Sequence, residues 1–233
     1  CVGNDSGESI TSAIGSTALG KGALQSNQTG DLNTAVGFEA GKLITGGLNT
    51  VVGYQAADSL ASGTSNTVLG ARAFYAADGS ETNSTIIGTD AGNAINHDDT
   101  DGNVIIGNDA GTGGAAALIS CVAIGYNAMN STGGNAQTGT VAVGKDALTA
   151  LTSGAKNTAI GYQAGDTLTT GYENTIVGYG ADTDANSRAG CVIIGYNLSL
   201  NTASDNVVEI GNDTNSMTYD LDGGDITVTS DVR

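Results

Sequence analysis

The chain has 233 residues, including 37 glycines and no proline or tryptophan, and its formal net charge is −17. This charge argues against binding to nucleic acid or to anionic membrane surfaces, because both would repel the chain. No apolar run is long enough to span a bilayer, so we expect no membrane insertion. Aromatic residues make up only 4% of the chain, too few for a large globular core, and the proline-rich triplet repeat of collagen is absent.

Residues 1–10 show no repeat and are interpreted as a lead-in. From residue 11 to residue 215 one short pattern recurs, and each copy is marked by an anchor glycine. The anchors are Gly15, Gly37, Gly53, Gly70, Gly88, Gly107, Gly125, Gly144, Gly161, Gly178, Gly195 and Gly211, with spacings of 16–19 after a first gap of 22. A unit this short must stack on its neighbours to form a core. The sequence therefore predicts an all-β, parallel β-solenoid of about twelve coils.

Each anchor follows a three-residue strand pattern, seen in Thr158, Ala159 and Ile160 before Gly161. The first and third residues share one face of the strand, and the middle residue lies on the other. The middle residue is apolar in eleven of twelve coils, and Glu209 is the exception. A strand that is apolar on both faces is expected to be buried on both. We expect Ile160 to fill the coil and Ala159 to face a partner chain.

The turns also repeat. Asparagine opens the strand in six coils, where it can bond nearby backbone and tolerate a left-handed conformation, at Asn33, Asn49, Asn66, Asn103, Asn157 and Asn174. Alanine three residues after most anchors indicates a tightly packed corner. A second aliphatic position recurs at Ile44, Leu60, Ile95, Leu151 and Leu168. This position predicts a return strand, and thus two short strands in each coil.

The coils between Gly70 and Gly144 are the longest and least regular. Extra residues in a solenoid lie in loops on one flank, so this flank is a candidate recognition surface. The candidate receptor-facing residues in these loops are Tyr75, Asp78, His97, Asp99, Asn130 and Asn135.

Aromatic residues directly follow six anchors, at Phe38, Tyr54, Tyr126, Tyr162, Tyr179 and Tyr196. Stacking between successive coils accounts for them as packing. Alternatively, the exposed run of Tyr162, Tyr179 and Tyr196 would offer a platform for sugar rings, and these three are also candidate receptor residues. The threonine row that includes Thr34 and Thr50 suggests ice binding. Its aliphatic neighbours favour an inward orientation instead.

Catalytic, metal and cofactor sites are not expected. His97 is the only histidine, and no recognisable nucleophile and base accompany it. None of the 24 acidic residues lies in the setting of a paired-carboxylate hydrolase. Residues 182–186 begin like a calcium loop, but Ser187 and Ile193 occupy the positions that need glycine and glutamate.

The three cysteines do not form a disulfide framework. Cys121 and Cys191 lie four coils apart, which is roughly 19 Å at ~4.8 Å per coil and exceeds the ~7 Å limit for bridging. We interpret them as buried thiols. The alternative is that Cys1, Cys121 and Cys191 meet their copies in a partner chain.

The units at residues 157–164 (Asn-Thr-Ala-Ile-Gly-Tyr-Gln-Ala) and 16–24 (Ser-Thr-Ala-Leu-Gly-Lys-Gly-Ala-Leu) resemble the head repeats of trimeric autotransporter adhesins and similar repeats in bacteriophage tail fibres. The resemblance covers roughly residues 11–215. It implies a left-handed β-roll in a homotrimer, whose neighbouring protomers would bury the second apolar face. The coils of 16–19 residues depart from the shorter, more uniform repeat common in adhesin heads.

Residues 216–233 are interpreted as a terminal cap. Residues 229–233 resemble the start of the endosialidase-type intramolecular chaperone that follows many phage fibres, and residues 208–212 resemble the sequence before such junctions. The resemblance implies a processing junction at Ser230 and Asp231, where the chaperone of that family cuts itself off.

The sequence thus predicts a non-enzymatic, trimeric tail-fibre segment for host attachment, located in the virion and outside the cell. Its expected partners are its own copies, the rest of the tail, and a host-cell surface receptor such as a glycan. The alternatives are an adhesin head on a bacterial cell surface and a purely structural spacer. Eleven steps of ~4.8 Å predict a rod of about 53 Å.

Overall fold

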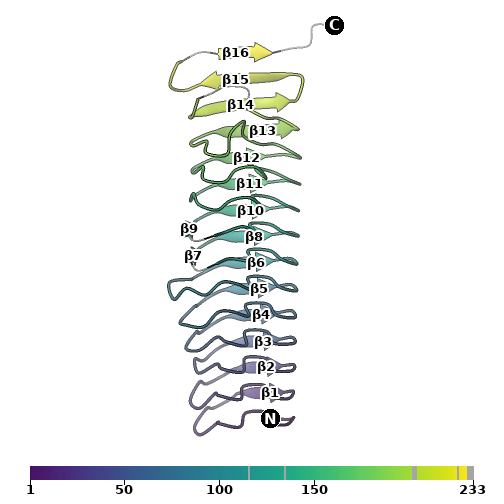
Figure 1. The fold of residues 1–233 in the computed structure, drawn as a ribbon, viewed down its shortest axis with the longest axis vertical. Coiled ribbons are helices and arrows are strands. Elements are labelled where there is room, and N and C mark those ends of the chain that lie inside the picture. The colour runs from purple at the N-terminus through teal and green to yellow at the C-terminus, as the bar shows by residue number, and fades with distance from the viewer. Residues whose placement is uncertain (115, 134, 201–203, 225, 230–233) are drawn as a thin grey trace.

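The structure is a computed structural model that describes residues 1–114, 116–133, 135–200, 204–224 and 226–229. These residues form an all-β rod of stacked parallel coils with about eleven turns, which confirms the predicted β-solenoid (Figure 1). The described residues contain no helix that could cross a membrane. The processing junction expected at Ser230 and Asp231 lies outside them.

One side of the rod is a fourteen-stranded sheet within the described part of the chain. Its parallel strands, one in each coil, are β1 (Thr17–Leu19), β2 (Thr34–Val36), β3 (Thr50–Val52), β4 (Thr67–Leu69), β5 (Thr85–Ile87), β6 (Val104–Ile106), β8 (Val122–Ile124), β10 (Val141–Val143), β11 (Thr158–Ile160), β12 (Thr175–Val177), β13 (Val192–Tyr196) and β14 (Val207–Asn212). Two antiparallel strands, β15 (Ser216–Asp220) and β16 (Ile226–Thr229), complete it. The parallel strands pair in register, so each repeat position stacks on itself.

The return half of the coils differs from the sequence prediction. In the described residues it holds strands in two coils, β7 (Leu118–Ile119) and β9 (Gln137–Thr138), which form a small second sheet. Elsewhere the chain crosses this side in turns, whose backbones still bond between coils. For example, the Thr45 amide donates to the Ala61 carbonyl at 2.7 Å. The second aliphatic position is fully buried, as at Ile44. A short coil can therefore bury this position without an extended strand.

The strand orientation is also opposite to the prediction. Ala159 is fully buried, whereas Ile160 is 42% exposed. The same pattern holds in the other parallel strands, where the middle residue is buried and the residues beside it are exposed or half-exposed. Asn157, two positions before Ala159, is buried as well. Because side chains alternate along a strand, Thr158 and Ile160 face outward, and so does the whole threonine row.

The buried asparagines form a ladder that joins neighbouring coils. Nδ2 of Asn49 donates to Oδ1 of Asn33 at 3.2 Å and to the Gly63 carbonyl at 2.9 Å. Oδ1 of Asn49 accepts the Asn66 amide at 3.0 Å. The left-handed conformation belongs to the preceding residue, as at Leu48 with φ of 64°. The asparagine therefore links coils while its neighbour makes the turn.

The first coil begins in a different register from the one assigned by sequence. Its strand is Thr17–Leu19, so Gly20 takes the anchor position in place of Gly15. Val2, in the expected lead-in, pairs with Leu19, and the Val2 amide donates to the Ala18 carbonyl at 2.8 Å. Residues 16–24 contain two similar short units, and the first of them thus forms the strand.

Candidate functional sites

One continuous surface of the rod, which we call the outward face, is formed by the two residues that flank the buried middle position of each of the twelve parallel strands. The row beside the anchors consists of Leu19, Val36, Val52, Leu69, Ile87, Ile106, Ile124, Val143, Ile160, Val177, Ile194 and Ile210. The other row consists of Thr17, Thr34, Thr50, Thr67, Thr85, Val104, Val122, Val141, Thr158, Thr175, Val192 and Val208. None of these side chains is buried, and none is charged.

The outward face is long and narrow. Three residues at ~3.3 Å each give a width of about 10 Å, and eleven steps of ~4.8 Å give about 53 Å, for an area on the order of 500 Å². An area of this size lies within the range of the largest apolar patches on monomeric proteins, which are often functional. Its chemistry suits packing against another apolar surface.

The predicted tyrosine run forms a stacked ladder. The ring centroids of Tyr162 and Tyr179 lie 4.9 Å apart, and those of Tyr179 and Tyr196 lie 5.4 Å apart, with interplanar angles of 12° and 22°. Tyr179 is 50% exposed and Tyr196 is 58% exposed. Nζ of Lys145 lies 5.1 Å from the Tyr162 ring centroid. The stacking prediction is confirmed, and the ladder also offers solvent-facing aromatic surface that could contact a sugar ring.

The candidate residues of the irregular loops differ in their exposure to solvent. Tyr75, Asp78, Asp99 and Asn135 are exposed and His97 is half-exposed. Within the described residues, His97 and Asp99 contact each other, since Nδ1 of His97 accepts the Asp99 amide at 3.2 Å. These exposed groups do not contribute to the cavity described below.

Three hydrogen bonds show how these loops are held. The side chain of Asn130 donates to the Asp109 carbonyl at 3.1 Å and to Oδ1 of Asn127 at 3.3 Å, so it ties its corner to a neighbouring coil. The amide of Ser80 donates to Oδ1 of Asp98 at 3.2 Å, which places residues 75–80 against the next loop. The loops therefore stack like the coils that carry them.

The acidic loop at residues 182–186 uses its carboxylates internally. Oδ2 of Asp182 accepts the Thr167 hydroxyl at 2.7 Å, and burial raises the pKa of Asp182 to about 6. Oδ1 of Asp184 accepts Nε of Arg188 at 2.6 Å. The described residues contain no group of three or more His, Cys, Asp or Glu side chains arranged to hold a metal ion.

The cysteines match their interpretation as thiols. Cys121 and Cys191 are free and buried, and Cys1 is free and exposed. Burial raises the pKa of both buried thiols.

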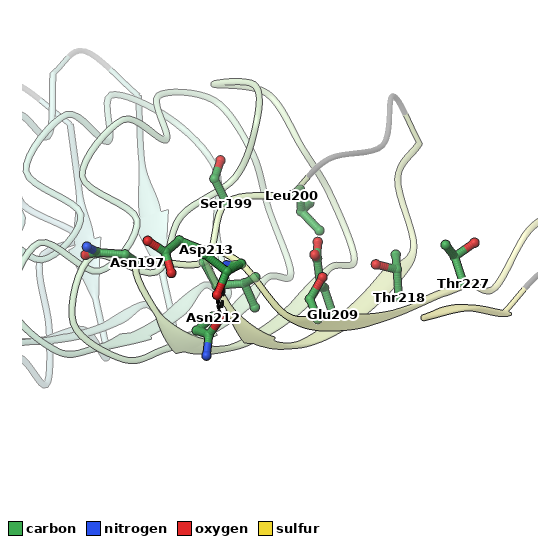
Figure 2. Close-up of a pocket in the computed structure, with 11 residues that line it drawn as sticks. Asn197, Ser199, Leu200, Glu209, Asn212, Asp213, Thr218 and Thr227 are labelled. Carbon is green, nitrogen blue, oxygen red and sulfur yellow. Dashed lines mark hydrogen bonds between the residues drawn. The ribbon is translucent and has the colours of Figure 1, made fainter. Parts of the chain in front are cut away.

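A cavity of about 580 Å³ lies at the C-terminal end of the solenoid, and sequence reasoning did not find it. Its lining consists of Asn197, Leu198, Ser199, Leu200, Glu209, Asn212, Asp213, Thr214, Ser216, Thr218 and Thr227. Figure 2 shows Glu209, Thr218 and Thr227 on successive strands, with Ser199 and Leu200 across the cavity and Asn197 and Asp213 toward one end. The one signal in the sequence was Glu209, the acidic residue at the middle strand position that is apolar in the other coils.

No protein-family model, curated protein or solved structure matches the chain.

Proposed function

We propose that this chain is a rigid, non-enzymatic segment of a phage tail fibre, that it assembles as a homotrimer, and that it presents a surface for host attachment. The segment would belong to the virion and lie outside the cell. The outward face is the observation that carries the proposal, because a row of aliphatic side chains and a row of threonines and valines run along the twelve parallel strands without a charged residue. The resemblance of residues 157–164 and 16–24 to trimeric fibre and adhesin repeats favours three chains.

The size of the outward face supports self-association. Burying on the order of 500 Å² at about 25 cal/mol per Å² of apolar surface contributes at most about 12 kcal/mol per chain, because the threonine hydroxyls in this area are polar. The loss of translational and rotational freedom on association costs about 4–15 kcal/mol, so the two terms are comparable and good packing would favour assembly. Because the outward face lacks charged side chains, chains with a net charge of −17 could meet there without placing acid against acid.

A homotrimer would present three copies of the tyrosine ladder. The exposed rings of Tyr179 and Tyr196 offer an amphipathic surface suited to a sugar ring. Three weak sites on one rigid rod gain avidity without any new contact. We therefore propose a host-surface glycan as the receptor class.

Mass measurement tests the assembly. Multi-angle light scattering should give three times the chain mass of 22.9 kDa. Val52→Lys combined with Val143→Lys, both on the outward face, should give monomers with an unchanged circular dichroism spectrum. The control is Leu43→Lys, at a 42% exposed leucine outside the sheet, and it should leave the trimer intact. A monomeric parent chain, or a trimer that tolerates both lysines, would refute assembly through this face.

Glycan-array binding by the intact trimer tests attachment. Tyr179→Ala removes the middle ring of the ladder and should reduce binding at least tenfold. Tyr54→Ala is the matched control, because Tyr54 is similarly exposed at 52% but stacks on Phe38 in a separate pair. Absence of glycan binding by an intact trimer would favour the structural spacer.

A further inference from the structure

The inward-facing row of the sheet changes from apolar to polar at the last parallel strand. In this row Ile176 pairs with Ile193, Ile193 with Glu209, Glu209 with Thr218, and Thr218 with Thr227. Ile176 and Ile193 fill closed coils and are fully buried. The three polar residues line the cavity, because β14, β15 and β16 continue the sheet beyond the last regular coil. The polar row is thus the wall of a built site.

Glu209 places a buried carboxylate without a positively charged partner among the described residues that line the cavity. This residue is only 2% exposed, and within the described residues its Oε2 atom has no hydrogen-bond partner. The lining adds a second carboxylate, Asp213, and none of the described lining residues is Lys, Arg or His. A buried carboxylate is stable when a donor, preferably a cationic one, pairs with it. A ligand is the natural source of that donor.

The rest of the lining suits hydroxyl groups. The Thr218 and Thr227 hydroxyls stand in line with Glu209 (Figure 2), and a hydroxyl can both donate and accept a hydrogen bond. On another side, Oδ1 of Asn212 accepts the amides of Thr214 at 3.0 Å and Asn215 at 2.8 Å, which fixes the loop that borders the cavity. The site is therefore largely preformed.

We propose that this cavity binds a small organic cation with a primary ammonium group and several hydroxyls, of the chemical class of the amino sugars. The ammonium group donates to Oε2 of Glu209, and the ligand hydroxyls bond to Thr218 and Thr227. The volume of about 580 Å³ falls within the usual range for small-molecule sites and exceeds the need of a single metal ion. The cavity lies on the inward side of the sheet, so this site does not depend on the outward face or on the tyrosine ladder.

Two matched sugars test the charge requirement. Isothermal titration calorimetry of the full chain at pH 7 should show D-glucosamine binding at least tenfold more tightly than N-acetyl-D-glucosamine, which replaces the ammonium group with a neutral amide. Equal affinities, or no binding of glucosamine at millimolar concentration, would overturn the proposal. Saturation by calcium chloride in place of glucosamine would overturn it in favour of a metal site.

Substitutions in the lining test whether glucosamine binds in the cavity. Glu209→Gln keeps the side-chain shape and should weaken glucosamine binding at least tenfold, whereas Glu173→Gln, at a glutamate exposed on the rod and paired with Lys156, should not. Thr218→Val keeps the carboxylate, and it should weaken both sugars several-fold while preserving the preference for glucosamine. Thermal unfolding verifies that each variant is folded. Undiminished binding by a folded Glu209→Gln variant would refute the site.

Discussion

The carbonyl oxygen of Gly178 occupies the space that a Cβ atom on Gly161 would need. Gly161 also has φ of +141°, a conformation that other residues rarely adopt. The same relationship recurs along the anchor row, because in-register coils place each anchor against the next. Close approach and backbone conformation together require glycine here.

Replacing this anchor should therefore destabilise the rod. We expect Gly161→Ala to cost about 1–3 kcal/mol for the backbone conformation and about 1–3 kcal/mol more for the displaced neighbouring coil. Gly139→Ala is the control, since Gly139 has φ of +63° but a methyl group added there would meet no atom within 4 Å. The control should cost only the backbone penalty of about 1–2 kcal/mol. Unfolding in urea measures the loss of unfolding free energy in both variants. Equal losses would contradict the inference that contact with the next coil requires glycine at position 161.

The asparagine ladder should be similarly sensitive. Asn49→Ala removes four inter-coil hydrogen bonds and leaves the Asn66 backbone amide and the Gly63 carbonyl without this partner. Each buried group left unsatisfied costs about 1–3 kcal/mol, so we expect a loss of about 2–4 kcal/mol. Asn108→Ala, at an exposed asparagine bonded to one carbonyl, should change stability by less than about 0.5 kcal/mol. Comparable losses of stability in the two variants would argue that the asparagine ladder does not stabilise the rod.

The raised pKa of Asp182 leads us to predict that the stability of the fold depends on pH. Burial is the main cause that raises the pKa of Asp182 from 3.8 to about 6, and the charge of Asp166 adds to it. The folded state thus binds this proton more tightly than the unfolded state. The stabilising contribution of this group is therefore complete below pH 4 and is lost as the pH rises through 6. At about 1.4 kcal/mol per pH unit, the loss is ~3 kcal/mol.

Removing the neighbouring charge of Asp166 tests this pH dependence. Asp166→Asn should lower the pKa of Asp182, and it should raise the unfolding temperature at pH 7 more than at pH 4, where Asp182 is protonated in either case. Asp5→Asn, at an exposed residue far along the rod, should show no such difference. An equal effect of Asp166→Asn at both pH values would exclude this coupling.

The thiols should react at very different rates. Cys1 is exposed, whereas Cys121 and Cys191 are buried and have raised pKa values. Because the thiolate is the reactive form, we expect one rapid equivalent with Ellman's reagent in the native protein and three after denaturation. Three rapid equivalents in the folded protein would contradict the buried positions.

Several features were predictable because the repeat itself encodes them. The spacing of the anchors and the strand pattern before them predicted in-register parallel coils, and the alanines after the anchors predicted tight corners such as fully buried Ala164. The tyrosine ladder followed from the same logic, since identical positions in stacked coils must lie side by side. Local turn chemistry was less reliable. The return turns, and the positive φ at Leu48 in place of the asparagine, depend on how tightly each coil closes.

The cavity could not be predicted from the sequence pattern. Glu209 was visible as an exception, but its burial beside Thr218 and Thr227 arises from an antiparallel extension that lies outside the repeat. The length of the middle loops indicated a common flank, and the sequence could not show which inter-coil bonds hold the loops there, such as the bond from the Ser80 amide to Asp98.

By itself, the sequence determined a stack of short, in-register β-coils, because its apolar, asparagine and glycine positions recur at nearly constant spacing. Only the tertiary structure decided which strand face is inside. Both faces are apolar, so hydrophobicity alone could not distinguish Ala159 from Ile160. The asparagine ladder holds Asn157 on the inward side, and Ala159, two residues later, is buried on that same side. Strict alternation then directs Ile160 and the threonine row outward.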